Sequence, residues 1–130
     1  MIKKILLIVS CCFLMIGCTK TSDIDQQEQL ITRFYEAYEV SDFEEMMKYV
    51  TDSFVDYFFH EGDVCGNASA SLIEFDRNLN VIRGSETWIY TSININPVPE
   101  SSLYGEVTTS LFVVVKMING EWIITGLETG

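Results

Sequence analysis

The chain carries one histidine, His60, and two carboxylates follow it at Glu61 and Asp63. An imidazole beside carboxylates can ligate a metal ion or act as an acid–base pair near neutral pH. The same pattern is also typical of an exposed strand end. The sequence contains no second cluster of histidines or cysteines to support a zinc site and no glycine-rich phosphate loop. We therefore expect neither a metal nor a cofactor.

Two tyrosines, Tyr35 and Tyr38, could supply a phenolic hydroxyl to a reaction that uses His60. Their spacing places them on one face of a helix together with Ile31 and Phe34. Buried tyrosines at such spacing are more often part of an apolar core edge than catalytic groups. The pattern thus favours a structural role for both.

The composition indicates a single folded domain and limits its partners. Of the 130 residues, 48% are hydrophobic, which is too many for a disordered chain. Acidic residues outnumber basic ones 19 to 8, and the net charge is −11. Nucleic acid is an unexpected partner, because phosphate binding needs a basic face.

The first 17 residues are organised like a secretory signal peptide. Lys3 and Lys4 form a short positive region, and residues 5–17 contain no charge. A helix of this length spans about 20 Å, whereas a bilayer core is roughly 30 Å thick. We therefore predict a signal peptide at residues 1–17 and not a membrane span.

The end of this segment, Met15-Ile16-Gly17-Cys18, resembles the lipobox of bacterial lipoproteins. Met15 departs from the leucine that is usual at its position. The resemblance implies cleavage before Cys18 and attachment of lipid to that residue, which would hold the protein on the extracytoplasmic side of a membrane. Thr19 is not the aspartate that retains lipoproteins in the inner membrane. The implied location is the outer membrane where the host has one, and otherwise the cell membrane. A signal peptide without lipid and an uncleaved anchor are the alternatives.

Cleavage would change the charge and the cysteine content of the mature chain. Loss of Lys3 and Lys4 leaves 6 basic and 19 acidic residues, a net charge of −13. An anionic membrane surface repels such a protein, so the lipid must provide the anchoring. Residues 18–23 are expected to be the lipidated cysteine and a short tether, and residues 24–130 the domain. Cys65 then has no partner for an internal disulfide.

Two helices are expected after the tether. Ser22 or Asp23 can cap a helix that runs to about Glu39. Ser41 and Glu44 form a capping box for a short second helix. The inner face of that helix is expected to carry Phe43, Met46, Met47 and Val50.

The middle of the chain is predicted as a strand followed by a third helix. Aromatic residues and valines between Ser53 and His60 favour a strand, with a turn at 61–63 and a very short strand at 64–65. Residues 69–84 are predicted to be helical, with Gly84 at the C-terminal cap. This prediction depends on the helical spacing of Leu72, Phe75, Leu79 and Ile82, and on a capping box of Ser71 and Glu74.

The last third is predicted as an antiparallel meander with strands at 86–96, 103–118 and 121–128. Asn119-Gly120 is a strong signal for a two-residue type I′ turn. That turn places Met117 opposite Trp122 and Val115 opposite Ile124. In the first of these strands, one face carries Ile89, Ile93 and Ile95, and the other carries Trp88, Tyr90 and Asn94.

Segments 31–38, 41–50 and 119–124 together resemble the nuclear transport factor 2-like superfamily, which includes ketosteroid isomerases, scytalone dehydratases and polyketide cyclases. The resemblance covers roughly residues 24–128. It implies an α+β fold in which N-terminal helices pack on a curved antiparallel sheet, forming a cone that often holds a pocket. It also makes a homodimer through the sheet possible. A plain cystatin-like α+β domain is the structural alternative.

The isomerase members of that superfamily use a tyrosine and an aspartate in the cone. If the aspartate of their Gly-Asp pair is matched to Asp42, their tyrosine falls on Phe34, which has no hydroxyl. Their catalytic aspartate falls near Tyr57 or Phe58, and Asp56 would point to the opposite face of the predicted strand. The resemblance therefore implies no isomerase machinery here.

Two functional hypotheses remain from the sequence. The favoured one is a non-catalytic domain that binds a small apolar ligand or an envelope protein, with Trp88, Tyr90 and Trp122 helping to line the cone or a partner surface. The alternative is a small isomerase, hydratase or cyclase that uses Tyr35 or Tyr38 with His60.

Overall fold

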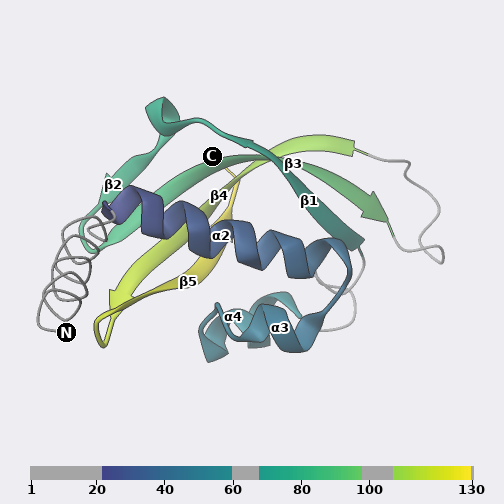
Figure 1. Ribbon diagram of the computed structural model, residues 1–130, viewed down its shortest axis with the longest axis horizontal. Helices are drawn as coiled ribbons and strands as arrows, with labels where there is room; N and C mark the ends of the chain where they lie inside the picture. The colour runs from purple at the N-terminus through teal and green to yellow at the C-terminus, as the bar shows by residue number, and fades with distance from the viewer. Residues whose placement is uncertain (1–21, 60–67, 98–106, 130) are drawn as a thin grey trace, which may run out of the picture.

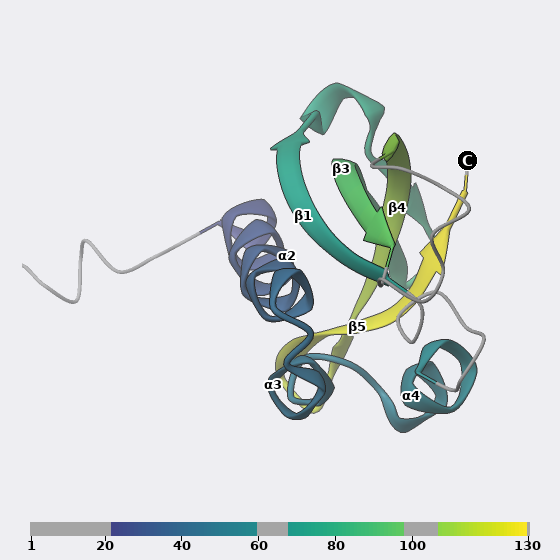
Figure 2. The same cartoon turned by 90° about the vertical axis from the view of Figure 1, so that its right-hand side faces the viewer.

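The computed structural model describes residues 22–59, 68–97 and 107–129. Three helices come first along the chain, and an antiparallel sheet of five strands follows (Figure 1). The helices are α2 (Asp23–Glu39), α3 (Phe43–Met47) and α4 (Asp52–Phe58), and the remaining elements are β1 (Ala68–Phe75), the 3₁₀ turn η1 (Arg77–Leu79), β2 (Val81–Arg83), β3 (Glu86–Pro97), β4 (Val107–Ile118) and β5 (Glu121–Glu128). The domain is thus α+β, with helices packed on a curved antiparallel sheet, as the sequence predicts (Figure 2).

Helix α2 begins and ends where the sequence predicts. The hydroxyl of Ser22 caps it by accepting a hydrogen bond from the backbone N–H of Asp25 at 3.4 Å. One apolar face is buried against the sheet, and it carries Ile31, Phe34, Tyr35, Ala37 and Tyr38. The aromatic residues of α2 therefore form the centre of the core.

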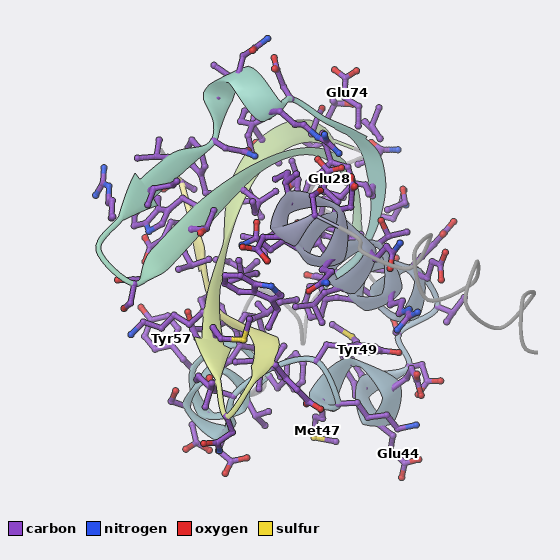
Figure 3. The ribbon with its side chains drawn as sticks, turned by 60° about the vertical axis from the view of Figure 1, so that its left-hand side comes forward. Glu28, Glu44, Met47, Tyr49, Tyr57 and Glu74 are labelled. Carbon is purple, nitrogen blue, oxygen red and sulfur yellow. The ribbon has the colours of Figure 1, made fainter. Side chains whose placement is uncertain are left out.

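Helix α3 is capped one residue later than predicted. Asp42 accepts from the backbone N–H of Glu45 at 3.2 Å, whereas Ser41 lies outside the helix with φ of 55°. Its predicted inner face is also only partly correct. Met46 is buried, but Phe43 and Met47 are about two-fifths exposed, and Met47 lies on the outside of the helix (Figure 3). The helix ends at Met47 and is too short to carry the predicted stripe; Val50 is buried beyond its end, where it forms a bridge to Ile124.

The predicted strand at residues 53–60 is wrong, because Asp52–Phe58 form helix α4. Thr51 caps this helix by accepting from the backbone N–H of Phe54 at 3.3 Å. Phe54 and Phe58 lie one turn apart, with ring centroids 4.6 Å from each other. The dense aromatic composition therefore follows a helical period here and fills the base of the core.

The predicted helix at residues 69–84 is also wrong, because the segment forms β1, η1 and β2. A bulge between Leu72 and Glu74 adds one residue to β1. Leu72 and Phe75 consequently both pack against the core at a spacing of three, which imitates a helical period. Leu79 and Ile82, the other two members of the predicted stripe, are 47% and 78% exposed. Gly84 has the positive φ expected of a cap, but it lies in the turn between β2 and β3.

The C-terminal meander is confirmed within the described residues. Strand β3 begins at Glu86 as expected, and β4 and β5 meet at a turn in which Asn119 and Gly120 have φ of 52° and 81°. The register pairs Met117 with Trp122 and Val115 with Ile124, as predicted.

The sheet has the order β1-β3-β4-β5, and β2 pairs with β3 beyond the end of β1. We call the side that packs against α2 the inner face and the opposite side the outer face. On the inner face, side chains of β3, β4 and β5 are fully buried at Ile89, Thr91, Ile93, Val113, Val115 and Ile124. The outer face carries Trp88, Tyr90, Phe112 and Val114, which belong to the alternate set of residues.

Several predictions concern residues outside the described ranges. These are the signal peptide at 1–17, Cys18, the turn and strand at 61–65, Cys65, His60 and the first residues of the strand expected from Leu103. Among the described residues, no helix combines the length and apolar character needed to cross a membrane.

Candidate functional site

The space between α2 and the inner face is filled by aromatic side chains. Phe34 makes edge-to-face contacts with Tyr35, Tyr38 and Phe54, at ring-centroid distances of 5.4, 5.8 and 5.7 Å. All four side chains are at most 1% exposed. These four aromatic side chains therefore fill the space between them by packing against one another.

The hydroxyl of Tyr35 takes part in a buried chain of hydrogen bonds. It lies 3.1 Å from Oγ1 of Thr91, which donates to the carbonyl of Leu111 at 2.8 Å. A carbonyl only accepts, so the single proton of Thr91 points to Leu111 and the Tyr35 hydroxyl donates to Thr91. Tyr35 thus ties α2 to β3 and β4 through its hydroxyl, a structural task for this candidate catalytic group.

Of the other residues of the catalytic hypothesis, the structure describes only Tyr38. Tyr38 is 1% exposed and stacks on Tyr35, with ring centroids 6.2 Å apart. His60 lies outside the described residues. Across residues 22–59, 68–97 and 107–129, no three histidine, cysteine or carboxylate side chains cluster in a way that could hold a metal ion.

Trp88 and Tyr90 lie on the outer face, in a small aromatic group with Phe112. The ring centroid of Phe112 is 5.8 Å from each of theirs, and the guanidinium of Arg83 lies 4.2 Å from the Trp88 ring centroid. Val114 lies on the same face and is 3% exposed. These side chains cover part of the outer face by local contacts across neighbouring strands.

Trp122 faces the opposite way from Trp88 and Tyr90. It packs against the core and lines a hollow of about 280 Å³ together with Gln26, Leu30 and other residues of α2 and the β4–β5 turn. The structure therefore does not gather the three predicted pocket residues around one space. The indole nitrogens of Trp88 and Trp122 are shielded from solvent and have no hydrogen-bond partner among the described residues, so neither is exposed to a ligand at the surface.

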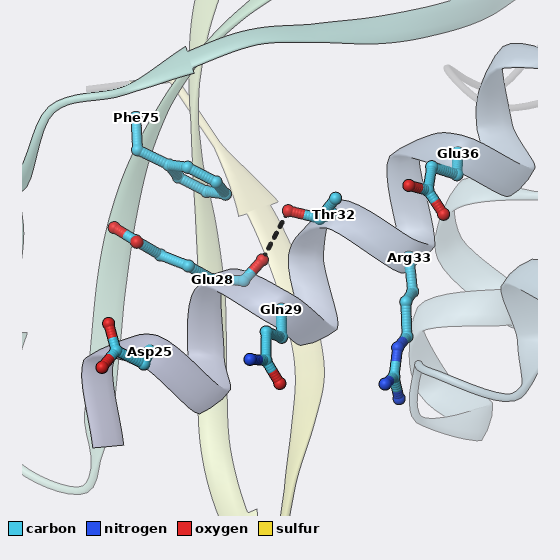
Figure 4. Close-up of a pocket in the computed structure, with 7 residues that line it drawn as sticks. All are labelled: Asp25, Glu28, Gln29, Thr32, Arg33, Glu36 and Phe75. Carbon is cyan, nitrogen blue, oxygen red and sulfur yellow. Dashed lines mark hydrogen bonds between the residues drawn. The ribbon is translucent and has the colours of Figure 1, made fainter. Parts of the chain in front are cut away.

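A hollow of about 480 Å³ follows the solvent side of α2 beside Phe75 (Figure 4). Asp25 and Glu28 line it, and Arg77 of η1 binds both carboxylates at 2.7 and 2.9 Å. Hydrogen bonds from Ser22 and Arg77 lower the pKa of the Asp25 carboxyl, and the two carboxylates raise the pKa of the Arg77 guanidinium. Two of the carboxylates that line this hollow thus link α2 to η1 through Arg77.

A second groove, of about 340 Å³, separates α4 from β5. Its helix side is lined by Ser53, Phe54, Tyr57 and Phe58, and its strand side by residues 125–128. Tyr57 is 73% exposed although it is aromatic. We call this space the α4–β5 groove. Sequence reasoning missed it because residues 53–60 were expected to be a strand; Thr51 as a cap and the spacing of Phe54 and Phe58 were the signals for a helix.

No family model matches the chain, and no curated protein matches it. Among solved structures, the chain is similar to an NTF-2-like protein of unknown function from Shewanella oneidensis MR-1, with a TM-score of 0.49 and 12% sequence identity. The alignment covers 82% of this chain and 97% of that chain. This likeness concerns the overall arrangement of elements and carries nothing about function. Function must therefore be argued from the surfaces of this chain.

Proposed function

We propose that the protein is a lipid-anchored domain on the extracytoplasmic side of a membrane, where it binds another molecule without catalysing a reaction. The observation that carries the second part is the filled interior. The side chains of Phe34, Tyr35, Tyr38 and Phe54, which pack between the helices and the inner face, are at most 1% exposed. A substrate has no room among them, so binding falls to the surface of the domain.

The state of Tyr35 supports the same proposal. A catalytic hydroxyl has to reach a reacting atom, whereas this hydroxyl donates to Thr91 within the buried chain that ends at Leu111. Breaking that chain to receive a substrate would cost the stabilisation it provides. The sequence-based alternative, an isomerase, hydratase or cyclase, gains no support from the described residues.

The anchor is proposed from the sequence around Cys18. The lipobox-like residues 15–18 follow an uncharged segment that is too short to span a bilayer, and the mature chain would carry a net charge of −13. Two or more acyl chains hold a protein on a membrane where electrostatic attraction cannot. The proposed location is the outer membrane in a host with two membranes and the cell membrane otherwise.

Metabolic labelling with an alkyne fatty acid tests the anchor. We expect label on the intact chain and none on the Cys18→Ala variant, which should also remain unprocessed. A matched Cys65→Ala variant should keep the label, because that cysteine lies far outside the lipobox. Equal labelling of the Cys18→Ala variant would contradict the anchor.

Native mass spectrometry of the full lipidated chain, released from detergent, tests the binding function. We expect the mass of the bare protein, or of a complex with another protein, because the interior is filled. An excess of a few hundred daltons that is lost on denaturation would show a small apolar ligand inside and would reopen the catalytic alternative. The same spectrum shows whether the chain is a monomer or a homodimer.

A further inference from the structure

Strand β5 is an edge of the sheet, and only part of that edge is covered by the described residues. The N–H of Ile124 donates to the carbonyl of Tyr49 at 2.9 Å, and the N–H of Thr51 donates to the carbonyl of Ile124 at 3.1 Å. Val50 and Ile124 form an isolated parallel bridge. The backbone groups of Ile124 therefore point away from β4, toward the segment that leads into α4.

The direction of the N–H and C=O groups of Leu127 follows from that of Ile124. Ile124 is opposite Val115 and directs its hydrogen bonds away from it, so this pair is a non-hydrogen-bonded pair of the ladder. Two residues earlier on β4, Val113 repeats that orientation and lies opposite Leu127. The bulge in β5 between these pairs absorbs the extra residue. The N–H and C=O of Leu127 consequently point off the edge of the sheet.

Beyond Ile124, no described residue forms a bridge to this edge. Helix α4 lies beside it instead, across the α4–β5 groove (Figure 2). An edge strand whose outward backbone groups meet no bridge from the described residues is an arrangement in which an extended peptide can add a strand to a sheet. The groove volume of about 340 Å³ lies within the range of ligand sites.

The groove also has a chemical preference. Its helix side offers an aromatic wall at Tyr57 and Phe58, and its strand side ends at the exposed carboxylate of Glu128. Asp52 and Asp56 are exposed on the same helix, and none of the residues that line the groove is basic. On a chain with a net charge of −11, this rim attracts positive charge.

We propose that the α4–β5 groove binds an extended segment of a partner protein, with alternating apolar and basic side chains, which adds a strand to the edge of β5 at Leu127. This inference rests on the proposed binding function and names its surface and the chemistry of the partner. Backbone hydrogen bonds supply the ladder, the apolar side chains contact Tyr57 and Phe58, and the basic side chains meet Glu128.

Fluorescence anisotropy with the full chain in detergent tests the proposal. The probe is a labelled peptide of alternating lysine and valine, and two control peptides accompany it. One replaces lysine with glutamate; the other keeps lysine but carries N-methyl groups on alternate residues, which removes the N–H donors and keeps the charge. We expect saturable binding of the probe, with affinity at least roughly tenfold lower for each control. Equal binding of the N-methylated peptide, or no binding of the probe, would overturn the proposal.

Exposed variants separate the groove from the rest of the surface. Tyr57→Ala should weaken binding of the probe roughly tenfold, since an aromatic wall is a typical hot spot. Ile82→Ala on β2 is the matched control, because Ile82 is 78% exposed and lies outside the groove, and it should leave the affinity unchanged. Glu128→Lys should weaken the lysine probe and strengthen the glutamate peptide. Circular dichroism verifies that each variant is folded.

Photo-crosslinkers placed at positions 57 and 90 in cells distinguish failure of the groove from failure of the binding function. A defined partner that is captured from position 90 on the outer face but not from position 57 would overturn the groove and leave the binding function in place. A small ligand inside the domain in native mass spectrometry would contradict the filled interior on which surface binding rests and would reopen the catalytic alternative. If the chain forms a dimer and the probe peptide dissociates it, the β5 edge binds a second copy of the chain. That result would overturn the proposal of a separate partner protein.

Discussion

The inner and outer faces of strands β3 and β4 are closed in different ways. On the inner face, Ile89, Thr91 and Val113 are fully buried because α2 lies over them. On the outer face, side chains of the sheet cover one another: Phe112 lies between Trp88 and Tyr90, all three are partly exposed, and Val114 is 3% exposed. The first face depends on a helix distant in sequence, and the second on neighbouring strands.

This difference has consequences for stability and for function. When a side chain is shortened on the buried inner face, its neighbours are already packed and a cavity remains, which lowers stability. On the partly exposed outer face, solvent and neighbouring side chains can fill the space. Matched groups lie on the two sides of the sheet: Phe34 and the Tyr35–Thr91 pair between α2 and the inner face, and Phe112 and the Tyr90–Ser110 pair on the outer face. Substitutions in these matched groups test whether burial under α2 makes the stability of the protein more sensitive to changes on the inner face than on the outer face.

The largest effect is expected from removing a central aromatic ring. Phe34→Ala should lower the free energy of unfolding by about 3–5 kcal/mol, because it leaves a cavity among rings that cannot collapse. Phe112→Ala should cost about 1–2 kcal/mol, since its ring is partly exposed and its removal exposes little new surface. Urea unfolding of both variants measures the difference. Equal losses would show that the two faces are packed alike.

The next effect concerns the matched hydroxyl pairs. Thr91→Val removes the acceptor of the Tyr35 hydroxyl and the donor to the Leu111 carbonyl, so it should cost about 1–3 kcal/mol. On the outer face, the hydroxyl of Tyr90 donates to Ser110 at 3.1 Å in an exposed position. Ser110→Ala should therefore change stability by less than about 0.5 kcal/mol.

Urea unfolding at one pH compares these two variants directly. A loss at Ser110 as large as that at Thr91 would contradict the view that burial decides the cost of a broken hydrogen bond.

A smaller effect is expected where a cation covers the outer face. Arg83→Met keeps much of the apolar stem but removes the guanidinium that lies over the Trp88 ring. We expect a loss of about 0.5–1 kcal/mol, and Arg83→Lys should recover part of it. A double-mutant cycle with Trp88→Leu isolates the pairwise coupling energy. A coupling near zero would show that the ring needs no cation above it.

The smallest effect is expected at the exposed ion pair between Arg77 of η1 and Asp25 of α2, beside the inner face. Arg77→Met should raise the pKa of the Asp25 carboxyl toward its ordinary value, because Arg77 is one cause of its lowering. A depressed folded-state pKa contributes stability that is present above the unfolded pKa and is lost as pH falls through the folded pKa. The variant should thus lose less stability on acidification, by a small amount, because both groups are largely exposed.

Carbon-detected NMR titration of the carboxyl groups measures the Asp25 pKa in both proteins. Arg83→Met is the control, because Arg83 contacts Trp88 and not α2, and it should leave the Asp25 pKa where it is. An unchanged pKa in the Arg77→Met variant would mean that the Ser22 hydroxyl alone holds the carboxyl in its charged form.

Local signals in the sequence were sufficient for some elements. Ser22 and the stripe of apolar residues behind it predicted α2 correctly, because a cap and an amphipathic period lie within one segment. Asn119-Gly120 predicted the last hairpin with its register, because a two-residue turn leaves no freedom in strand pairing. The same local reasoning placed the cap of α3 one residue early, at Ser41 and not at Asp42.

The α4–β5 groove was less predictable, because one of its two elements, α4, was expected to be a strand. Residues 53–60 are rich in aromatic side chains, which are typical of strands. The helix they form has only seven residues, so the helical spacing appears in a single pair, Phe54 and Phe58. The bulge in β1 then produced a false helical period at Leu72 and Phe75. Both errors arise because period and composition are ambiguous in short segments.

The sequence by itself determined the parts of this protein that depend on near neighbours: the charge, the long helix, the final hairpin and the alternation of β3 that separates Ile89 from Trp88. Only the tertiary structure decided what those parts enclose. The pairing of β1 with β3, the filling of the interior by α2 and α4, and the position of α4 beside the edge of β5 all depend on contacts between residues far apart in the chain. Such contacts form only after loop closure, and no local pattern of residues encodes their geometry.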